Sequence, residues 1–124
     1  MKVAIILFPG TNCEEDTAHA FKLLGCQTQI IWHKEDKINA DLVVLPGGFS
    51  YGDYLRTAAI AKFSPAMQAV KEHAKKGGYI LGICNGFQML LELGLLKGAM
   101  RRNENLNFVS KYHHLNCLLY TSDA

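Results

Sequence analysis

Short apolar runs alternate with longer amphipathic stretches along most of the chain. The runs are rich in β-branched residues and are bounded by Gly, Pro and polar positions, which is typical of strands. We expect strands at 3–8, 28–32, 42–45 and 79–83. The first run is apolar throughout, as in a parallel strand that is covered on both faces.

The stretches between these runs have the residue spacing of helices. Thr11 and Glu14 match the capping-box pattern, so we expect a helix to begin there and to end at Gly25. Its inward face would carry Ala18, Phe21 and Leu24. Strands that alternate with helices indicate βαβ units, which predict an α/β fold with a mainly parallel sheet and helices on both faces.

Three more helices are expected downstream, at 55–62, 64–76 and 87–93. Ser64 followed by Pro65 pairs an N-cap residue with a proline at the first helical position, which marks the start of the second of them. Beyond Gly98 the pattern weakens, and 108–109 is a further candidate for a strand.

Composition and charge support one folded domain and argue against several classes of protein. A chain of 124 residues, with 49% hydrophobic and 19% charged residues, is long enough for one core and too apolar for disorder. The net charge is +2 without a long basic block, so we expect no nucleic-acid partner. The opening apolar run is too short to span a membrane, so we expect a cytoplasmic protein.

The four cysteines are widely spaced and form no C-x-x-C pair. This density is far below that of a disulfide-stabilised secreted domain, which indicates free thiols in a reducing compartment and predicts no metal site. They are Cys13, Cys26, Cys84 and Cys117.

One of these cysteines lies between an expected strand and an expected helix, in the sequence Gly82-Ile83-Cys84-Asn85-Gly86. This G-x-C-x-G pattern is the thiol counterpart of the serine nucleophile elbow, in which flanking glycines allow a tight turn and leave the nucleophile open to substrate. The N-terminal end of the following helix would favour the thiolate, and its N–H groups could bind an oxyanion. The alternative is a small buried cysteine in an ordinary turn.

A second glycine motif, Pro46-Gly47-Gly48, follows the neighbouring expected strand. Ligands of open α/β sheets bind at the carboxyl ends of strands, so an N–H of this turn could be a second oxyanion donor near Cys84, although a plain turn is the alternative. Gln88 lies one helical turn beyond Cys84 and could present its amide to a substrate or simply face solvent.

The other thiols and the histidines are weaker candidates. Cys13 also follows a strand, but it lacks flanking glycines, so we expect a structural role. His33 and His73 lie among polar residues and are expected to be solvated. His113 and His114 are adjacent, so on a strand they would point to opposite faces rather than form a ligand pair.

Together these motifs resemble the class I glutamine amidotransferases, in particular the glutaminase subunit family of phosphoribosylformylglycinamidine synthase in purine biosynthesis. The similarity spans about residues 2–111 and implies a flavodoxin-like sheet. It is carried by the segments FPGTNCEED, LPGGFSYGDYLR, FSPAM, GICNGFQML and LGLLKGAMRRNENLNFVSK.

The resemblance implies that Cys84 attacks the side-chain amide of L-glutamine to give a thioester and ammonia, and that water then releases glutamate. Gly48 and Asn85 would supply the oxyanion N–H groups, while Gly47 and Gln88 would hold the substrate. The residues that would shape the pocket mouth or contact a partner are Tyr51, Gly52, Asp53 and Arg56.

The resemblance also implies partners. A large synthetase subunit and a small accessory subunit of the same synthase would use the ammonia to convert formylglycinamide ribonucleotide to its amidine. The synthetase would use ATP and magnesium, so we expect no cofactor in this subunit.

The family completes its catalytic triad with an H-x-E pattern downstream of the nucleophile, and no such pattern follows Cys84 here. We interpret 1–115 as the N-terminal part of a class I glutamine amidotransferase domain whose C-terminal part is missing. Residues 116–124 do not match the family and resemble translated vector sequence, so our hypothesis is a foreign tail. Without the histidine we expect the isolated chain to be inactive, and its open sheet edge to promote aggregation.

Two alternatives remain open at this point. A cysteine hydrolase or stress protein of the DJ-1/PfpI type combines a similar sheet with a cysteine elbow and uses a glutamate near the end of the first strand, for which Glu14 and Glu15 are candidates. Gln88 and the FSYGDYLR loop argue against it. The other alternative is a non-catalytic subunit that keeps the fold only as a binding surface.

Overall fold

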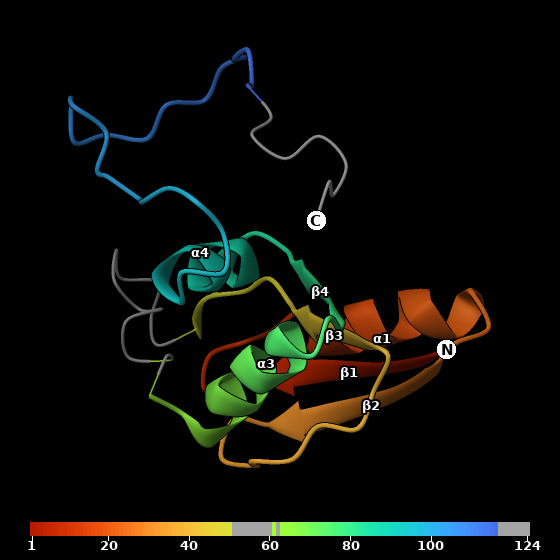
Figure 1. Cartoon of the computed structure of the whole chain (residues 1–124). Coiled ribbons are helices and arrows are strands. Elements are labelled where there is room, and N and C mark those ends of the chain that lie inside the picture. The colour runs from red at the N-terminus through yellow and green to blue at the C-terminus, as the bar shows by residue number, and fades with distance from the viewer. Residues whose placement is uncertain (51–60, 62, 117–124) are drawn as a thin grey trace.

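A four-stranded parallel sheet forms the centre of the computed structural model, which describes residues 1–50, 61 and 63–116 (Figure 1). All three neighbouring strand pairs are parallel, and the strand order is β2-β1-β3-β4. The strands are β1 (Lys2–Leu7), β2 (Gln27–Trp32), β3 (Leu42–Leu45) and β4 (Tyr79–Gly82). This order is that of the first four strands of flavodoxin-like folds, so the predicted fold class is confirmed.

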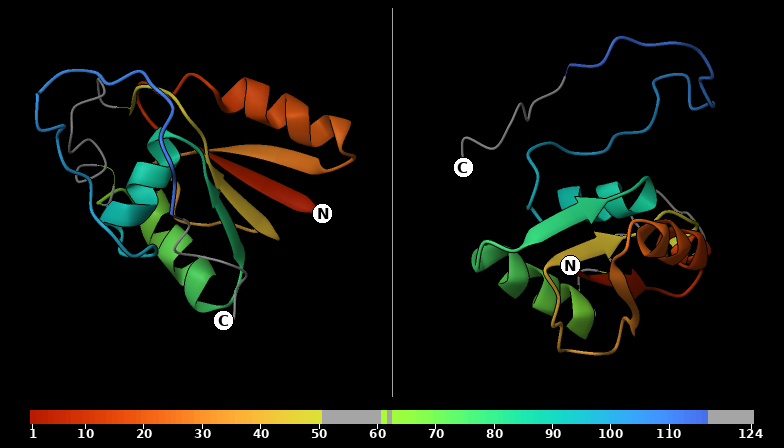
Figure 2. Two further views of the ribbon diagram at one scale, coloured as in Figure 1. Left: turned by 90° about the horizontal axis from the view of Figure 1, so that it is seen from above. Right: turned by 90° about the vertical axis from the view of Figure 1, so that its right-hand side faces the viewer.

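Helices cover both faces of the sheet (Figure 2). Helix α1 (Glu14–Leu23) lies on one face, and α3 (Pro65–Lys75) and α4 (Asn85–Glu92) lie on the other. Each connection from a strand through a helix to the next strand passes over one face. The loops that follow β1, β3 and β4 therefore meet at the carboxyl edge of the sheet.

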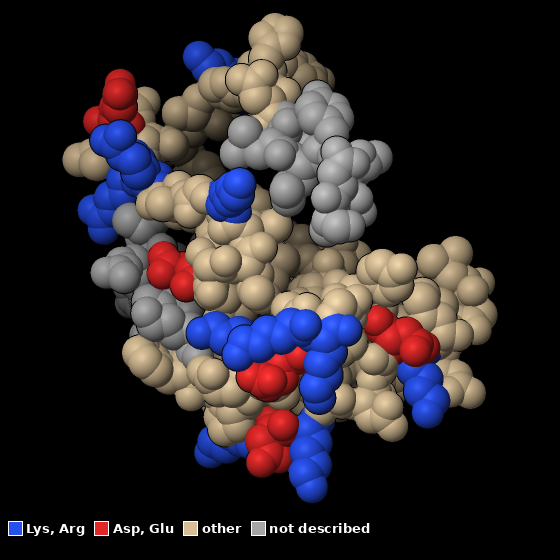
Figure 3. Space-filling view, in the orientation of Figure 1, with Lys and Arg blue, Asp and Glu red and all other residues tan. Residues whose placement is uncertain are grey.

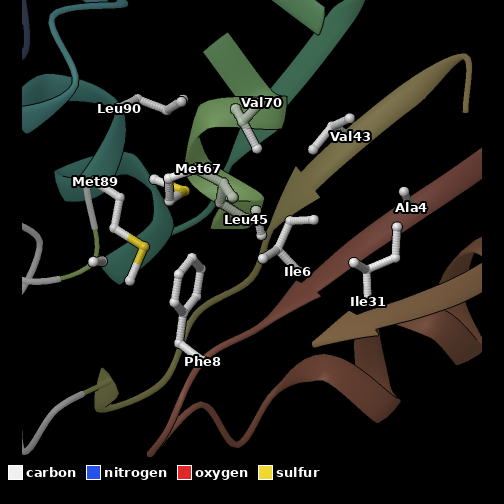
Figure 4. Packing of buried hydrophobic residues seen from close by; sticks show 12 residues of the cluster. Ala4, Ile6, Phe8, Ile31, Val43, Leu45, Met67, Val70, Met89 and Leu90 are labelled. Atoms are coloured by element: carbon white, nitrogen blue, oxygen red, sulfur yellow. The ribbon is translucent and has the colours of Figure 1, made fainter. Parts of the chain in front are cut away.

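The core has two layers because successive residues of a strand point to opposite faces. Val3 and Ile5 of β1 pack with Ala18 of α1, whereas Ala4 and Ile6 face α3 and α4, and all four β1 residues are fully buried. β1 is therefore covered on both faces, as its unbroken apolarity predicts. Figure 4 shows the larger layer, whose largest buried side chains are Phe8, Ile6, Leu45, Met67 and Met89.

One face of β4 is poorly covered. Leu81 pairs in register with Val44, which belongs to the layer beneath α1, but Leu81 remains 42% exposed because α1 does not reach β4. Tyr79 and Ile83 point to the same side and are also exposed. Within the described residues no strand pairs with the outer edge of β4. The side chains of Tyr79, Leu81 and Ile83 therefore form an exposed apolar strip along this end of the sheet.

Most predicted boundaries lie within one or two residues of the observed ones. The prediction 42–45 coincides with β3, and the helix after Ser64 begins at Pro65 as expected. Gly25 closes the first helix with a φ of +77°. The expected helix at 55–62 lies outside the described residues except for Ala61, which is helical and buried.

Three details of the prediction are wrong. Thr11 does not cap α1: its hydroxyl accepts the N–H of Phe8, and Cys13 takes the N-cap position. Leu24 does not face the core but is 75% exposed, because it follows the last helical residue where the chain turns. Residues 108–109 form no strand, since the whole segment 97–116 is exposed and lies beside no described strand that it could pair with.

The surface and the helix lengths add two observations. On the face drawn in Figure 3, basic and acidic side chains are interspersed rather than gathered by sign. In the described ranges, every helix is too short or too polar to cross a lipid bilayer.

Candidate active site

Cys84 occupies a sharp turn between β4 and α4, as the G-x-C-x-G pattern predicts. Its backbone angles, φ +51° and ψ −110°, are unusual for a residue with a side chain, and its side chain is exposed. A conformation of this kind costs on the order of 1–3 kcal/mol and persists only where the surrounding structure enforces it. The alternative of a buried cysteine in an ordinary turn is therefore wrong.

The two flanking glycines explain how this turn is enforced. A Cβ atom at Gly82 would lie 2.6 Å from Cδ1 of Leu90 and 2.8 Å from the carbonyl oxygen of Gly86. A Cβ atom at Gly86 would overlap the carbonyl oxygen of Leu45 in β3. The turn is thus pressed against both its own helix and the neighbouring strand, and only glycine fits at either position.

The Pro46-Gly47-Gly48 turn lies directly beside this elbow. The Ile83 N–H donates to the carbonyl oxygen of Leu45 at 3.0 Å, which ties the end of β4 to the end of β3. A Cβ built on Gly47 would lie 3.5 Å from Cβ of Cys84 and 3.9 Å from Sγ of Cys13. Gly47 therefore separates the two cysteines, and its backbone forms part of the surface next to Cys84.

Gly48 adopts a φ of +135°, which only glycine takes readily. A Cβ at this position would also lie 2.5 Å from Oδ1 of Asn12. In the part of the chain that the structure describes, neither the Gly48 N–H nor the N–H of Asn85 donates a hydrogen bond. Among the described residues, these two backbone donors thus have no acceptor.

Gln88 is not simply a solvated helix residue. It is half-buried, and its Oε1 accepts a hydrogen bond of 3.1 Å from Nδ2 of Asn85. Asn85 is only 1% exposed, and its Oδ1 is buried without a partner among the described residues. The hydrogen bond from Asn85 holds the side-chain amide of Gln88 against the first turn of α4. The backbone N–H of Gln88 donates to the carbonyl oxygen of Cys84.

Sequence reasoning underrated the loop between β1 and α1. Cys13, for which a purely structural role was expected, lies beside Gly47, and Thr11 and Asn12 contact the Gly48 region. Ser50, which is 1% exposed, bonds Thr11. One signal could have identified this loop: it follows the central strand, so it must reach the same sheet edge as the two glycine motifs.

Several predicted site residues cannot be placed, because Tyr51, Gly52, Asp53 and Arg56 lie outside the described residues. Among the described residues, no cluster of His, Cys, Asp and Glu side chains is arranged to hold a metal ion.

The histidines differ in their surroundings. His113 and His114 are exposed. His33 is half-buried rather than solvated, with its ring against Phe8 and Trp32. Burial, with a smaller contribution from the charge of Lys34, lowers the pKa of His33.

His73 is also less solvated than expected, because its Nε2 lies 3.1 Å from the carbonyl oxygen of Tyr79. No described histidine is hydrogen-bonded to Cys84.

Comparison with known proteins places this geometry in a family. The family model of the CobB/CobQ-like glutamine amidotransferase domain matches residues 1–117. A subunit named PurQ of phosphoribosylformylglycinamidine synthase from Campylobacter jejuni is 74% identical over 115 residues, which cover 93% of this chain and 52% of that protein. The subunit of the same name from Sulfurimonas denitrificans is 64% identical over 117 residues, with coverage of 93% and 52%.

A solved structure shows the same fold. A chain of PurLQS from Thermotoga maritima is 39% identical and superposes with a TM-score of 0.79, covering 90% of this chain and 52% of that one. The present chain thus spans about half the length of the curated relatives it matches. The match over nearly all of its residues, together with the elbow geometry, shows that the chain belongs to the CobB/CobQ-like glutamine amidotransferase domain family.

Proposed function

We propose that this chain carries the nucleophile of a glutaminase that hydrolyses L-glutamine to glutamate and ammonia. The observation that carries the proposal is the position of Cys84, an exposed thiol on a strained elbow beside the Pro46-Gly47-Gly48 turn. The N–H groups of Gly48 and Asn85, which have no acceptor among the described residues, are the donors that we assign to the oxyanion. A donor pair of this kind suits the oxyanion that forms when a thiolate attacks an amide carbonyl. The family match, to a glutamine amidotransferase domain, supports the same chemistry.

The reaction begins when the Cys84 sulfur forms a bond to the side-chain amide carbon of glutamine. The carbonyl oxygen then bears the negative charge, and the N–H groups of Gly48 and Asn85 stabilise it. Collapse of this intermediate breaks the carbon–nitrogen bond, and the nitrogen leaves as ammonia after it gains a proton. Water then adds to the thioester, which releases glutamate and restores the thiolate.

Substrate selection falls to the residues around the elbow. The amide of Gln88, held by Asn85, would bind the polar end of glutamine, and the absence of a side chain at Gly47 would leave room for the substrate next to Cys84. We include Tyr51, Gly52, Asp53 and Arg56 in the pocket mouth or partner contact on the basis of family resemblance alone. Cys84 has no hydrogen-bonded base among the described residues, so we expect covalent reaction without sustained turnover from this chain alone.

We further propose that the ammonia serves phosphoribosylformylglycinamidine synthase, with a large synthetase subunit and a small accessory subunit as partners. The relatives carry the name of a subunit of that synthase, and the solved structure of PurLQS contains a chain with this fold. The synthetase would supply ATP and magnesium chemistry, and this subunit would need no cofactor. The cytoplasm, where thiols stay reduced, is the expected location.

Covalent labelling with 6-diazo-5-oxo-L-norleucine tests the proposal without requiring turnover. We expect one adduct per chain by intact mass, located at Cys84, and protection by L-glutamine but not by D-glutamine. Cys84→Ser should abolish the adduct, whereas the matched variant Cys13→Ser should keep it. Labelling of Cys13, or no labelling of the folded chain, would reject the glutaminase assignment and favour a non-catalytic subunit. The DJ-1/PfpI alternative is already disfavoured by the family match.

A further inference from the structure

The loop after β1 is bonded to the segment 48–50, which carries the Gly48 N–H. Oγ1 of Thr11 lies 3.0 Å from Oγ of Ser50, and the same Oγ1 accepts the N–H of Phe8 at 3.2 Å. Phe8 is the residue that follows β1, and it is fully buried in the core. The Thr11 hydroxyl therefore connects the end of the central strand to the far end of the glycine turn.

Backbone contacts reinforce this connection. Thr11 and Gly48 form an isolated antiparallel bridge, and the Phe49 N–H donates to the carbonyl oxygen of Gly10 at 3.2 Å. Gly48 also lies so close to Asn12 that a Cβ atom would not fit between them. Gly48 and the two residues that follow it, Phe49 and Ser50, are thus tied to the same short loop.

These ties are needed because the segment is intrinsically free to move. Adjacent glycines such as Gly47 and Gly48 have more backbone conformations than any other residue pair, and a rotation of the peptide between them would change the direction of the Gly48 N–H. β3 holds one end of the segment through strand pairing. The other end is held by Thr11 and by Ser50, whose buried hydroxyl has Thr11 as its partner.

We propose that Thr11 is a positioning residue for the reaction at Cys84: through its hydroxyl bond to Ser50 it keeps the Gly48 N–H directed at the developing oxyanion. This inference rests on the proposed glutaminase function. A donor that is displaced by about 1 Å from its place in the transition state can cost about 100-fold in rate. The nucleophilicity of the thiol itself should not depend on Thr11.

Thr11→Val tests the inference because valine keeps the shape of threonine and removes only the hydroxyl. We expect the second-order rate of Cys84 labelling by 6-diazo-5-oxo-L-norleucine to fall by about 10-fold or more, because the ketone oxygen of this glutamine analogue would occupy the oxyanion site while the sulfur displaces dinitrogen from the adjacent, protonated carbon. Alkylation of Cys84 by iodoacetamide, which is not a glutamine analogue and does not need that site, should stay within about twofold. Thr11→Ser should restore the labelling rate. Thr28→Val, the same change in β2 away from the site, should leave both rates unchanged.

Hydrogen exchange provides an independent measurement of the contact. In Thr11→Val the Phe49 N–H should exchange at least about 10-fold faster, while the amides of α3 keep their protection. If Thr11→Val does not fold, as judged by circular dichroism, Ser50→Ala replaces it and should give the same pair of results.

Three results would overturn the inference, and they are distinguishable. If the wild-type chain labels at Cys84 but Thr11→Val labels equally fast, Thr11 does not position the donor, although the glutaminase proposal stands. Unchanged exchange at Phe49 would show that the hydroxyl does not hold the segment. If the wild-type chain does not label at all, the proposed function fails and the positioning role fails with it.

Discussion

Gly86→Ala is the substitution that tests most directly how the elbow is held in place. The added methyl would overlap the carbonyl oxygen of Leu45, an oxygen that already accepts the Ile83 N–H at 3.0 Å. A backbone atom of a central strand cannot move aside as a flexible side chain can. The N-terminal end of α4 must therefore shift away from β3, and Met89 and Leu90 lose contact with the core.

The expected loss of stability follows from two opposing effects. Alanine is favoured over glycine within a helix by about 1 kcal/mol. Overpacking against an unyielding neighbour costs about 3 kcal/mol, at the upper end of the usual range. The net change is a decrease of about 2 kcal/mol in the free energy of unfolding, which lowers the urea midpoint by about 1 M for a denaturant slope of about 2 kcal/mol per M.

Urea unfolding followed by far-ultraviolet circular dichroism measures this change, with Gly47→Ala as the matched control. A Cβ at Gly47 would meet its nearest neighbour at 3.5 Å, an ordinary contact distance, so we expect its stability to stay within about 0.5 kcal/mol of wild type. The reasoning is refuted if Gly86→Ala unfolds at the wild-type midpoint, or if Gly47→Ala is the more destabilised of the two.

Two other predictions concern acidity and self-association. Because the pKa of His33 is lowered in the folded state, the unfolded chain binds more protons near pH 6. The contribution of His33 to stability should therefore be full above the unfolded pKa of 6.5 and decline as the pH falls below it. Urea midpoints measured across this pH range should show the decline, and His33→Gln should flatten it. The exposed apolar strip of β4 should cause concentration-dependent association in sedimentation velocity. Leu81→Lys should reduce that association, whereas Leu24→Lys, at the exposed residue that follows α1, should not. A monomeric wild-type chain would contradict the prediction.

Much of the fold can be predicted from the sequence because its signals are local. β1 and β3 are apolar runs closed by glycine and proline, and the turn that closes the first helix contains Gly25, the kind of residue that a left-handed backbone position requires. The elbow is predictable for the same reason, since Gly82 and Gly86 on either side of Cys84 indicate a turn in which backbone segments pack too closely for a Cβ atom. Parallel order and a shared sheet edge then bring Gly47 and Cys84 together.

The errors arise where long-range contacts decide the outcome. Thr11 has a capping pattern, but its hydroxyl bonds Ser50, 39 residues away, and no local pattern reports that contact. Leu24 has helical spacing but follows the last helical residue, so spacing alone cannot tell that it leaves the core. The ring contacts of His33 with Phe8 and Trp32 depend likewise on the packing of a loop against the sheet.

The strained backbone of Cys84 makes this residue a reporter of folding at its own position. An unfolded or loosened elbow returns Cys84 to ordinary backbone angles and separates it from the turn at Gly47, yet the thiol remains able to react with a simple alkylating reagent. The ratio of the two reactivities, with the glutamine analogue and with iodoacetamide, would then measure the fraction of chains whose elbow is intact. Opening of the elbow could be followed in this way while the core formed by β1 and β3 stays folded.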